Sequence, residues 1–76
     1  MTPTDRQAVG RRIRAIRRQK DITQAELARR LGITSQSRVS DIERGRCAQN
    51  IDTLSAVAAA LGVEIRDFFP PTRRPR

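Results

Sequence analysis

The sequence predicts an all-α domain built from five short helices. Apolar residues recur three and four positions apart, as on one face of a helix, and no segment alternates with the two-residue period of a strand. Capping residues and glycines divide the chain at short intervals. With 76 residues, of which 37% are hydrophobic and 32% charged, the composition is typical of one small globular domain.

Each expected helix has its own start and stop signals. The first covers about residues 3–19 and begins with a proline, which suits a first helical position. The second, residues 24–31, opens with the capping pair Thr23 and Glu26 and stops at Gly32. The others are expected from Ser35 to about residue 44, between Asn50 and Gly62, and over residues 64–69. The predicted core stripe of the fourth is Ile51, Leu54, Val57, Ala58 and Leu61.

Charge and composition narrow the class of partner. The net charge of +8 favours a polyanion, either DNA, RNA or an anionic membrane surface. The two aromatic residues are too few for the base-stacking platforms that single-stranded RNA needs. No run of about 18 apolar residues predicts a membrane span, and residues 1–10 lack the pattern of a secretory signal. We therefore expect a cytoplasmic protein.

Catalytic and metal-binding chemistry lacks its usual residues. The chain has no histidine, and Cys47 is its only cysteine. The commonest general base, an intramolecular disulfide and the usual zinc ligands are therefore missing. We expect no enzymatic activity, no catalytic residue, no cofactor and no metal, and we interpret Cys47 as incidental.

The most informative segment is ITQAELARRLGITSQSRVSDIERG, residues 22–45. Two short helices are joined by a glycine-containing turn, Ala28 is small where the helices must approach, and Val39 and Ile42 can anchor the second helix. This is the helix-turn-helix pattern. The segments TQAELA, LG, SQSRVSDIERG and IDTLSAVAAALGVEIRDFF, in that order, resemble the lambda-repressor/Cro-like (XRE-type) regulators over about residues 6–69.

The resemblance implies a five-helix lambda-repressor-like domain that binds double-stranded DNA. We assign residues 1–69 to this domain and residues 70–76 to a basic, proline-rich flexible tail, which either attracts phosphates or is simply solvated. A protein of this family would be associated with the nucleoid through DNA. The third helix would then lie in the major groove.

At about 100° per residue, Val39, Ile42 and Glu43 share one side of that helix. The opposite side carries Gln36, Ser37, Ser40 and Asp41, which match the base-contacting positions of the family. Glutamine suits adenine, with two hydrogen bonds to N6 and N7. Without the resemblance, an ordinary solvated polar face would be the better interpretation. Asp41 either accepts from cytosine N4 or pairs with Arg38 or Arg44, and we favour pairing.

Other residues are expected to contact phosphates. The resemblance assigns this role to Gln24 at the start of the second helix, where free backbone N–H groups also favour an anion. The arginines flanking the third helix, Arg38, Arg44 and Arg46, suit the same task; the alternative for each is that it serves only solubility. Asn50 is either a helix cap alone or a cap that also contacts phosphate.

A structural ion pair is expected between Arg17 and Glu43. Each lies on a core-facing stripe, where an unpaired charge is costly, and the family joins these two positions. One departure from the family lies in the turn, because six residues rather than five separate Gly32 from Val39, the extra one at Ile33-Thr34. We expect a longer turn with Val39 and Ile42 still buried; a shifted helix would instead move the Gln36 and Ser37 assignments by one position.

A homodimer is expected through the C-terminal elements, as in many relatives. The fourth helix has small residues where a polar face would be usual, and Phe68 and Phe69 cannot both enter one small core. We assign Ala59, Ala60 and Phe69 to the interface; the alternative is that the alanines only permit close packing within the monomer.

The predicted function is regulation of transcription. We expect a dimeric repressor or autoregulator of a pseudo-palindromic operator. Two alternatives are an antitoxin that neutralises a toxin and binds its own promoter, since SQSRVS resembles some antitoxins, and a restriction-modification controller protein.

Overall fold

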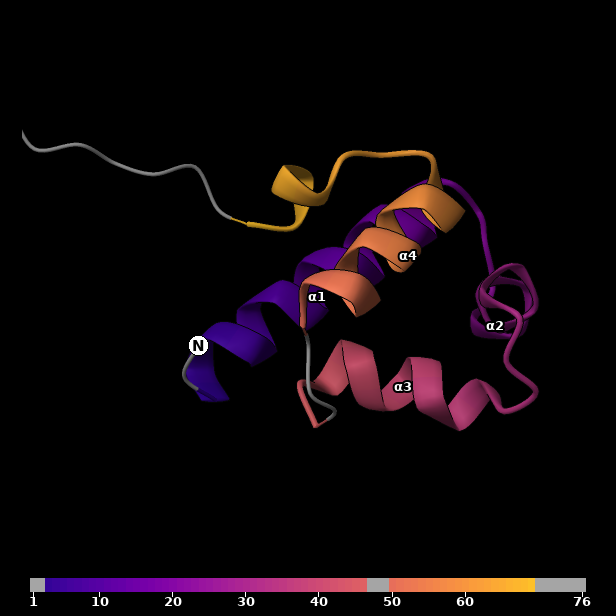
Figure 1. Ribbon diagram of the computed structural model, residues 1–76, viewed down its shortest axis with the longest axis horizontal. Coiled ribbons are helices and arrows are strands. Elements are labelled where there is room, and N and C mark those ends of the chain that lie inside the picture. The colour runs from indigo at the N-terminus through magenta and orange to yellow at the C-terminus, as the bar shows by residue number, and fades with distance from the viewer. Residues whose placement is uncertain (1–2, 47–49, 70–76) are drawn as a thin grey trace, which may run out of the picture.

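The computed structural model describes residues 3–46 and 50–69, and this part of the chain contains helices and no strand (Figure 1). The elements are α1 (Pro3–Gln19), α2 (Gln24–Leu31), α3 (Gln36–Arg44), α4 (Ile51–Leu61) and the 3-10 helix η1 (Ile65–Phe68). The all-α prediction is confirmed. None of the helices among the described residues is long and apolar enough to span a membrane.

The predicted fifth helix is the one element that was wrong in length and type. Residues 64–69 form only the four-residue 3-10 turn η1. The side chains of Glu64 and Asp67 close a capping box around it, and Phe69 already has an extended backbone, with φ −105° and ψ 142°. Pro70 disfavours a helical conformation of the residue before it, so the turn cannot continue.

The other helix boundaries follow the capping signals in the sequence. The Thr23 hydroxyl accepts from the Glu26 N–H at 3.0 Å, and the Asn50 side chain accepts from the Thr53 N–H at 2.8 Å. Ser35 begins α3 without such a bond; its hydroxyl lies 2.6 Å from the Ser37 hydroxyl instead. The boundaries of α1 to α4 agree with those predicted.

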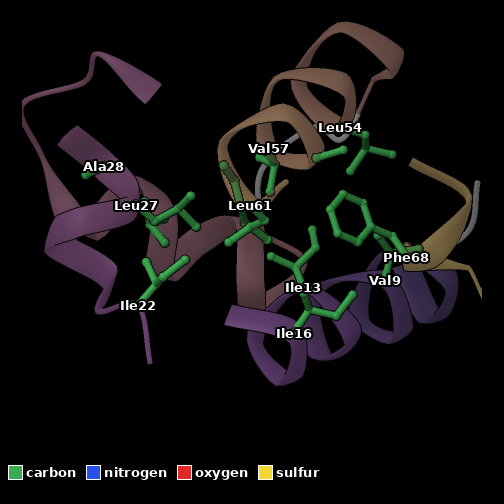
Figure 2. Close-up of a cluster of buried hydrophobic side chains, with 13 residues drawn as sticks. Val9, Ile13, Ile16, Ile22, Leu27, Ala28, Leu54, Val57, Leu61 and Phe68 are labelled. Carbon is green, nitrogen blue, oxygen red and sulfur yellow. The ribbon is translucent and has the colours of Figure 1, made fainter. Parts of the chain in front are cut away.

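A single hydrophobic core joins all five elements (Figure 2). The Phe68 ring of η1 is fully buried and points into the space between α1 and α4 (Figure 2). Ile51, however, is 65% exposed, so its assignment to the core stripe of α4 was wrong. It occupies the first position of α4, one turn beyond the buried part of the stripe. The buried hydrophobic residues are Val9, Ile13, Ile16, Ile22, Leu27, Ala28, Val39, Ile42, Leu54, Val57, Ala58, Leu61 and Phe68.

Helix α3 approaches α1 closely at two glycines. A Cβ atom at Gly10 would lie 2.3 Å from the Glu43 carbonyl oxygen, which no side chain can tolerate. A Cβ at Gly45 would lie 2.8 Å from the backbone nitrogen of Gln7, and Gly45 also has a φ of +76°, which favours glycine. The C-terminal half of α3 is therefore held directly against the backbone of α1.

Candidate nucleic-acid interface

Helix α3 is anchored on its inner side by Val39 and Ile42, which are 1% and 4% exposed. The preceding turn accommodates its extra residue by packing Ile33, half-buried, against the core, while Thr34 remains exposed. The predicted longer turn with a normally seated helix is thus confirmed. The Gln36 and Ser37 assignments need no shift in position.

The outer side of α3 is not covered by the described part of the chain. Gln36 and Ser37 are exposed, and Ser40 and Asp41 are half-exposed. Figure 1 shows α3 along one edge of the molecule, below α1 and α4, so that its outer side faces away from both. The four polar side chains predicted to contact bases therefore share an accessible surface. Their contact with bases stays a prediction.

Asp41 departs from the expected ion pair. Among the described residues it forms no ion pair with Arg38 or Arg44, although both lie three positions away on the same helix. An exposed pair at this spacing stabilises a helix by only about 0.2–0.5 kcal/mol, so the spacing permits an ion pair without requiring one. The preference for pairing was wrong, and the Asp41 carboxylate is left facing outward.

The predicted Arg17–Glu43 ion pair is confirmed and belongs to a larger network. Arg17 Nε donates to Glu43 Oε2 at 2.6 Å, and both side chains are more than nine-tenths buried. Arg17 Nη1 also donates to the Ile22 carbonyl at 2.7 Å, and Gln24 Nε2 donates to Glu43 Oε1 at 3.0 Å. The network therefore links α1, the start of α2 and α3.

The Gln24–Glu43 bond was not predicted. One side-chain N–H of Gln24 is used inside the protein, and the half-buried side chain is fixed beside α3. A glutamine at the first position of a helix gives no sequence signal of its partner, because the partner lies 19 residues away. A phosphate contact by Gln24 stays a prediction, with the amide now in a defined orientation.

Arginines flank the outer side of α3 on both edges. Arg38, Arg44 and Arg46 are all exposed. Arg38 lines a hollow toward α4, together with Thr53 and Ala56, whereas Arg44 lines a second hollow toward α1. This second hollow also includes Arg11 and Arg14, which the sequence analysis did not select. Asn50 is confirmed as the cap of α4, and its phosphate contact stays a prediction.

The face assigned to a dimer interface is largely exposed in the single chain. Ala59 is exposed, Ala60 half-buried and Phe69 39% exposed, whereas Phe68 is fully buried. The two phenylalanines thus point to different places, as predicted. The Ala60 carbonyl also accepts from Arg30 Nη1 at 3.0 Å. A partner on this face stays a prediction.

Two predicted features lie outside the described residues, namely Cys47 and the tail of residues 70–76. Within the described part of the chain, no group of three or more potential metal ligands comes together.

A short helix seated by two buried aliphatic residues, with a bare polar side between arginines, defines a helix-turn-helix domain. The model of the helix-turn-helix family matches residues 13–68, and the chain belongs to this family. It is 40% identical to y4dJ, an uncharacterised HTH-type transcriptional regulator of Sinorhizobium fredii, over 88% of this chain and 86% of that protein. The XRE-type resemblance is thereby confirmed.

Two further similarities concern a phage repressor and a solved structure. The chain is 46% identical to an immunity repressor protein of Bacillus phage phi105 over 75% of its own length, but this match spans only 39% of the repressor. The fold resembles the crystal structure of the restriction-modification controller protein C.AhdI from Aeromonas hydrophila, with a TM-score of 0.80 and 32% identity. That match covers 87% of this chain and 98% of C.AhdI.

Proposed function

We propose that this protein is a sequence-specific regulator of transcription that binds double-stranded DNA through α3 and does not act as an enzyme. The observation that carries the proposal is the geometry of α3, where Val39 and Ile42 are buried while Gln36 and Ser37 are exposed on the other side. A helix held in this way can enter the major groove without disturbing the core. DNA binding would place the protein in the cytoplasm, at the nucleoid.

Base recognition would centre on the N-terminal half of α3. Gln36 can form a bidentate pair with adenine, worth about 1–3 kcal/mol of discrimination against other bases. Ser37 and Ser40 would supply adaptable contacts. Asp41, without an ion pair among the described residues, would accept from cytosine N4 and would disfavour a guanine at the same position.

The proposal is tested by selecting bound sequences from random duplex DNA with the wild-type protein and with Gln36→Ala. We expect the wild type to select a pseudo-palindrome and the variant to lose preference at one position in each half-site. Gln19→Ala, at an exposed glutamine near the end of α1, is the matched control and should select the wild-type sequence. Failure of the wild type to enrich any sequence would contradict the proposed function.

Gln24 would act on the DNA backbone rather than on the bases. Its side chain is fixed by Glu43 at 3.0 Å, close to the first turn of α2, where free N–H groups favour a phosphate. Gln24→Ala should weaken binding to all sequences to a similar extent and leave the selected sequence unchanged. A changed sequence preference in this variant would instead place Gln24 among the base-reading residues.

The regulator would act as a homodimer on the pseudo-palindrome. A domain of this size buries little apolar surface alone, and Ala59, Ala60 and Phe69 leave apolar area at least partly exposed in the C-terminal elements. Two-fold symmetry would set the half-sites about 34 Å apart, one turn of DNA. Occupancy of an operator that overlaps its own promoter would make the protein a repressor and autoregulator.

A role as a restriction-modification controller is the second candidate, favoured by the match to C.AhdI over nearly the whole of that chain. A reporter fused to the selected operator separates the two roles, since a repressor lowers expression at all protein concentrations. A controller that activates should raise it at low concentration. Copurification with the product of an adjacent gene that is toxic alone would instead support the antitoxin alternative.

A further inference from the structure

A polar hollow of about 160 Å³ lies where α1, α2 and α3 meet. Its position follows from the close approach of α1 to α3 at Gly10 and from the Gln24–Glu43 bond, which holds the start of α2 beside α3. The side chains that line it are Arg11, Arg14, Gln24, Ser40, Glu43 and Arg44.

The electrostatics of this hollow favour an anion. The Glu43 carboxylate is already engaged, because Oε2 accepts from Arg17 and Oε1 accepts from Gln24. Arg11, Arg14 and Arg44 form no ion pair among the described residues, and all three are exposed. Three arginines without an ion pair therefore line one small polar space whose single carboxylate is already engaged, and guanidinium groups bind phosphate oxygens well.

The location of the hollow indicates which anion it takes. Ser40 lines the hollow and also belongs to the outer side of α3. An anion bound there would lie beside any base contacted by α3, where the sugar-phosphate backbone bordering the major groove must pass. A second hollow, about 360 Å³ in volume and lined by Arg11, Arg14, Ala15 and Arg18, continues along the outer face of α1.

We propose that Arg11 and Arg14 of α1, together with Arg44 of α3, clamp the phosphate backbone of DNA at the edge of the contacted groove. This inference rests on the proposed function and extends it, because it makes α1 part of the DNA-binding surface. The clamp is independent of sequence. It fixes the depth and angle at which α3 enters the groove, and Arg18 lies further along the path of the same strand.

The test measures affinity for the selected operator as a function of salt concentration, with wild type and the double variant Arg11→Gln/Arg14→Gln. Each lost phosphate contact should reduce the slope of log K against log salt by about 0.9 per bound subunit. We expect a reduction of about 0.9 if both arginines share one phosphate and about 1.8 if they hold two. The selected sequence should not change.

The matched control is Lys20→Gln/Arg66→Gln, which removes the same net charge at two exposed positions that do not line the hollow. An equal reduction in the slope of log K against log salt in both double variants would overturn the proposed clamp, because the reduction would then be a general effect of net charge. An unchanged slope in Arg11→Gln/Arg14→Gln would overturn it as well, while specific binding by the wild type would keep the proposed function intact. Circular dichroism should show both double variants fully helical.

A second measurement locates the clamped phosphate by replacing single operator phosphates with uncharged methylphosphonates. Replacing one phosphate that borders the groove should lower the affinity of the wild type. The same replacement should cause no further loss of affinity in Arg11→Gln/Arg14→Gln, because the contact is already missing. If the loss from the phosphate replacement and the loss from the double substitution are additive at every phosphate, the arginines do not act on the backbone and the inference is wrong.

Discussion

At the scale of single residues, the contact between α1 and α3 depends on Gly10, which faces the carbonyl groups of Ile42 and Glu43. Alanine in a helix interior is ordinarily more stable than glycine by about 1 kcal/mol. At this position we expect Gly10→Ala to destabilise the fold by about 1–3 kcal/mol, because the added methyl group forces the two backbones apart. Urea unfolding measures the difference.

The reverse substitution on the exposed face of the same helix isolates the propensity effect. Ala15→Gly should cost about 1 kcal/mol, since no tertiary contact is involved. If Gly10→Ala instead stabilised the protein by a similar amount, the close approach of α1 and α3 would be disproved.

The buried Arg17–Glu43 pair gives the second residue-scale prediction. Removing one partner leaves a charge without its counterion in the core, so Arg17→Met should cost about 3–5 kcal/mol. The double variant Arg17→Met/Glu43→Leu should cost less than the sum of the two single variants, because no buried charge remains. Additive losses in urea unfolding would show that the two side chains act independently.

The residues of the site differ in how far the sequence could reveal them. Arg17 and Glu43 interrupt apolar stripes, and this interruption alone marks them as buried charges. Gly10 gives no such signal in the sequence, because the reason for a glycine within this helix is the close approach of the α3 backbone. The prediction for Asp41 was wrong because helical spacing brings an arginine within reach of the carboxylate without requiring the two side chains to pair.

At the scale of elements, the short helix α2 is stabilised by a local charge cluster. Arg29 and Arg30 both bond the Glu26 carboxylate, and α2 is further tied to α4 by the bond from Arg30 to the Ala60 carbonyl. The side-chain hydrogen bonds from Arg29 and then Arg30 lower the pKa of Glu26 below its ordinary value of 4.5. The ionised carboxylate is thus favoured in the folded state.

A carboxyl group whose pKa is lowered on folding contributes stability that is complete above its unfolded value and is lost as pH falls through the folded value. The melting temperature of the wild type should therefore fall relative to that of Glu26→Gln as pH decreases below 4.5. Thermal melts followed by circular dichroism between about pH 6 and pH 3 provide the comparison. Parallel curves for the two proteins would contradict this role of Glu26.

The boundaries of α1 to α4 were predictable because they are set by residues adjacent to the helices in the sequence, such as Thr23 before α2 and Asn50 before α4. η1 was predicted less well, because four residues give too short a pattern to distinguish an α-helix from a 3-10 turn. Ile51 shows a related limit, since periodicity extends the apolar stripe to the first residue of α4 without revealing where the core stops.

At the scale of the whole molecule, the arginine-lined hollow could not be predicted. Arg11 and Arg14 lie about 30 residues from Ser40 and Arg44 in sequence, and only the crossing of α1 over α3 brings them together. Charge composition indicated a polyanionic partner but could not place it. The part of the proposed interface on α3 was predictable from a local motif, whereas the part proposed on α1 is a property of the assembled fold.

The last prediction concerns the dimer. Ala59 is exposed on α4, where a glutamate would place a charge in the proposed dimer interface. Ala59→Glu should be a monomer in sedimentation analysis at concentrations where the wild type is a dimer. Its affinity for the full pseudo-palindrome should fall to that for one half-site, because the gain from linking two binding sites is lost. Affinity for an isolated half-site should stay at the wild-type value, since α3 and the α1 arginines are untouched.

Gln19→Glu changes the net charge equally at an exposed position on α1 and should leave both measurements unaltered. A dimeric Ala59→Glu would move the interface away from α4, and cooperative binding would then require contact between subunits elsewhere.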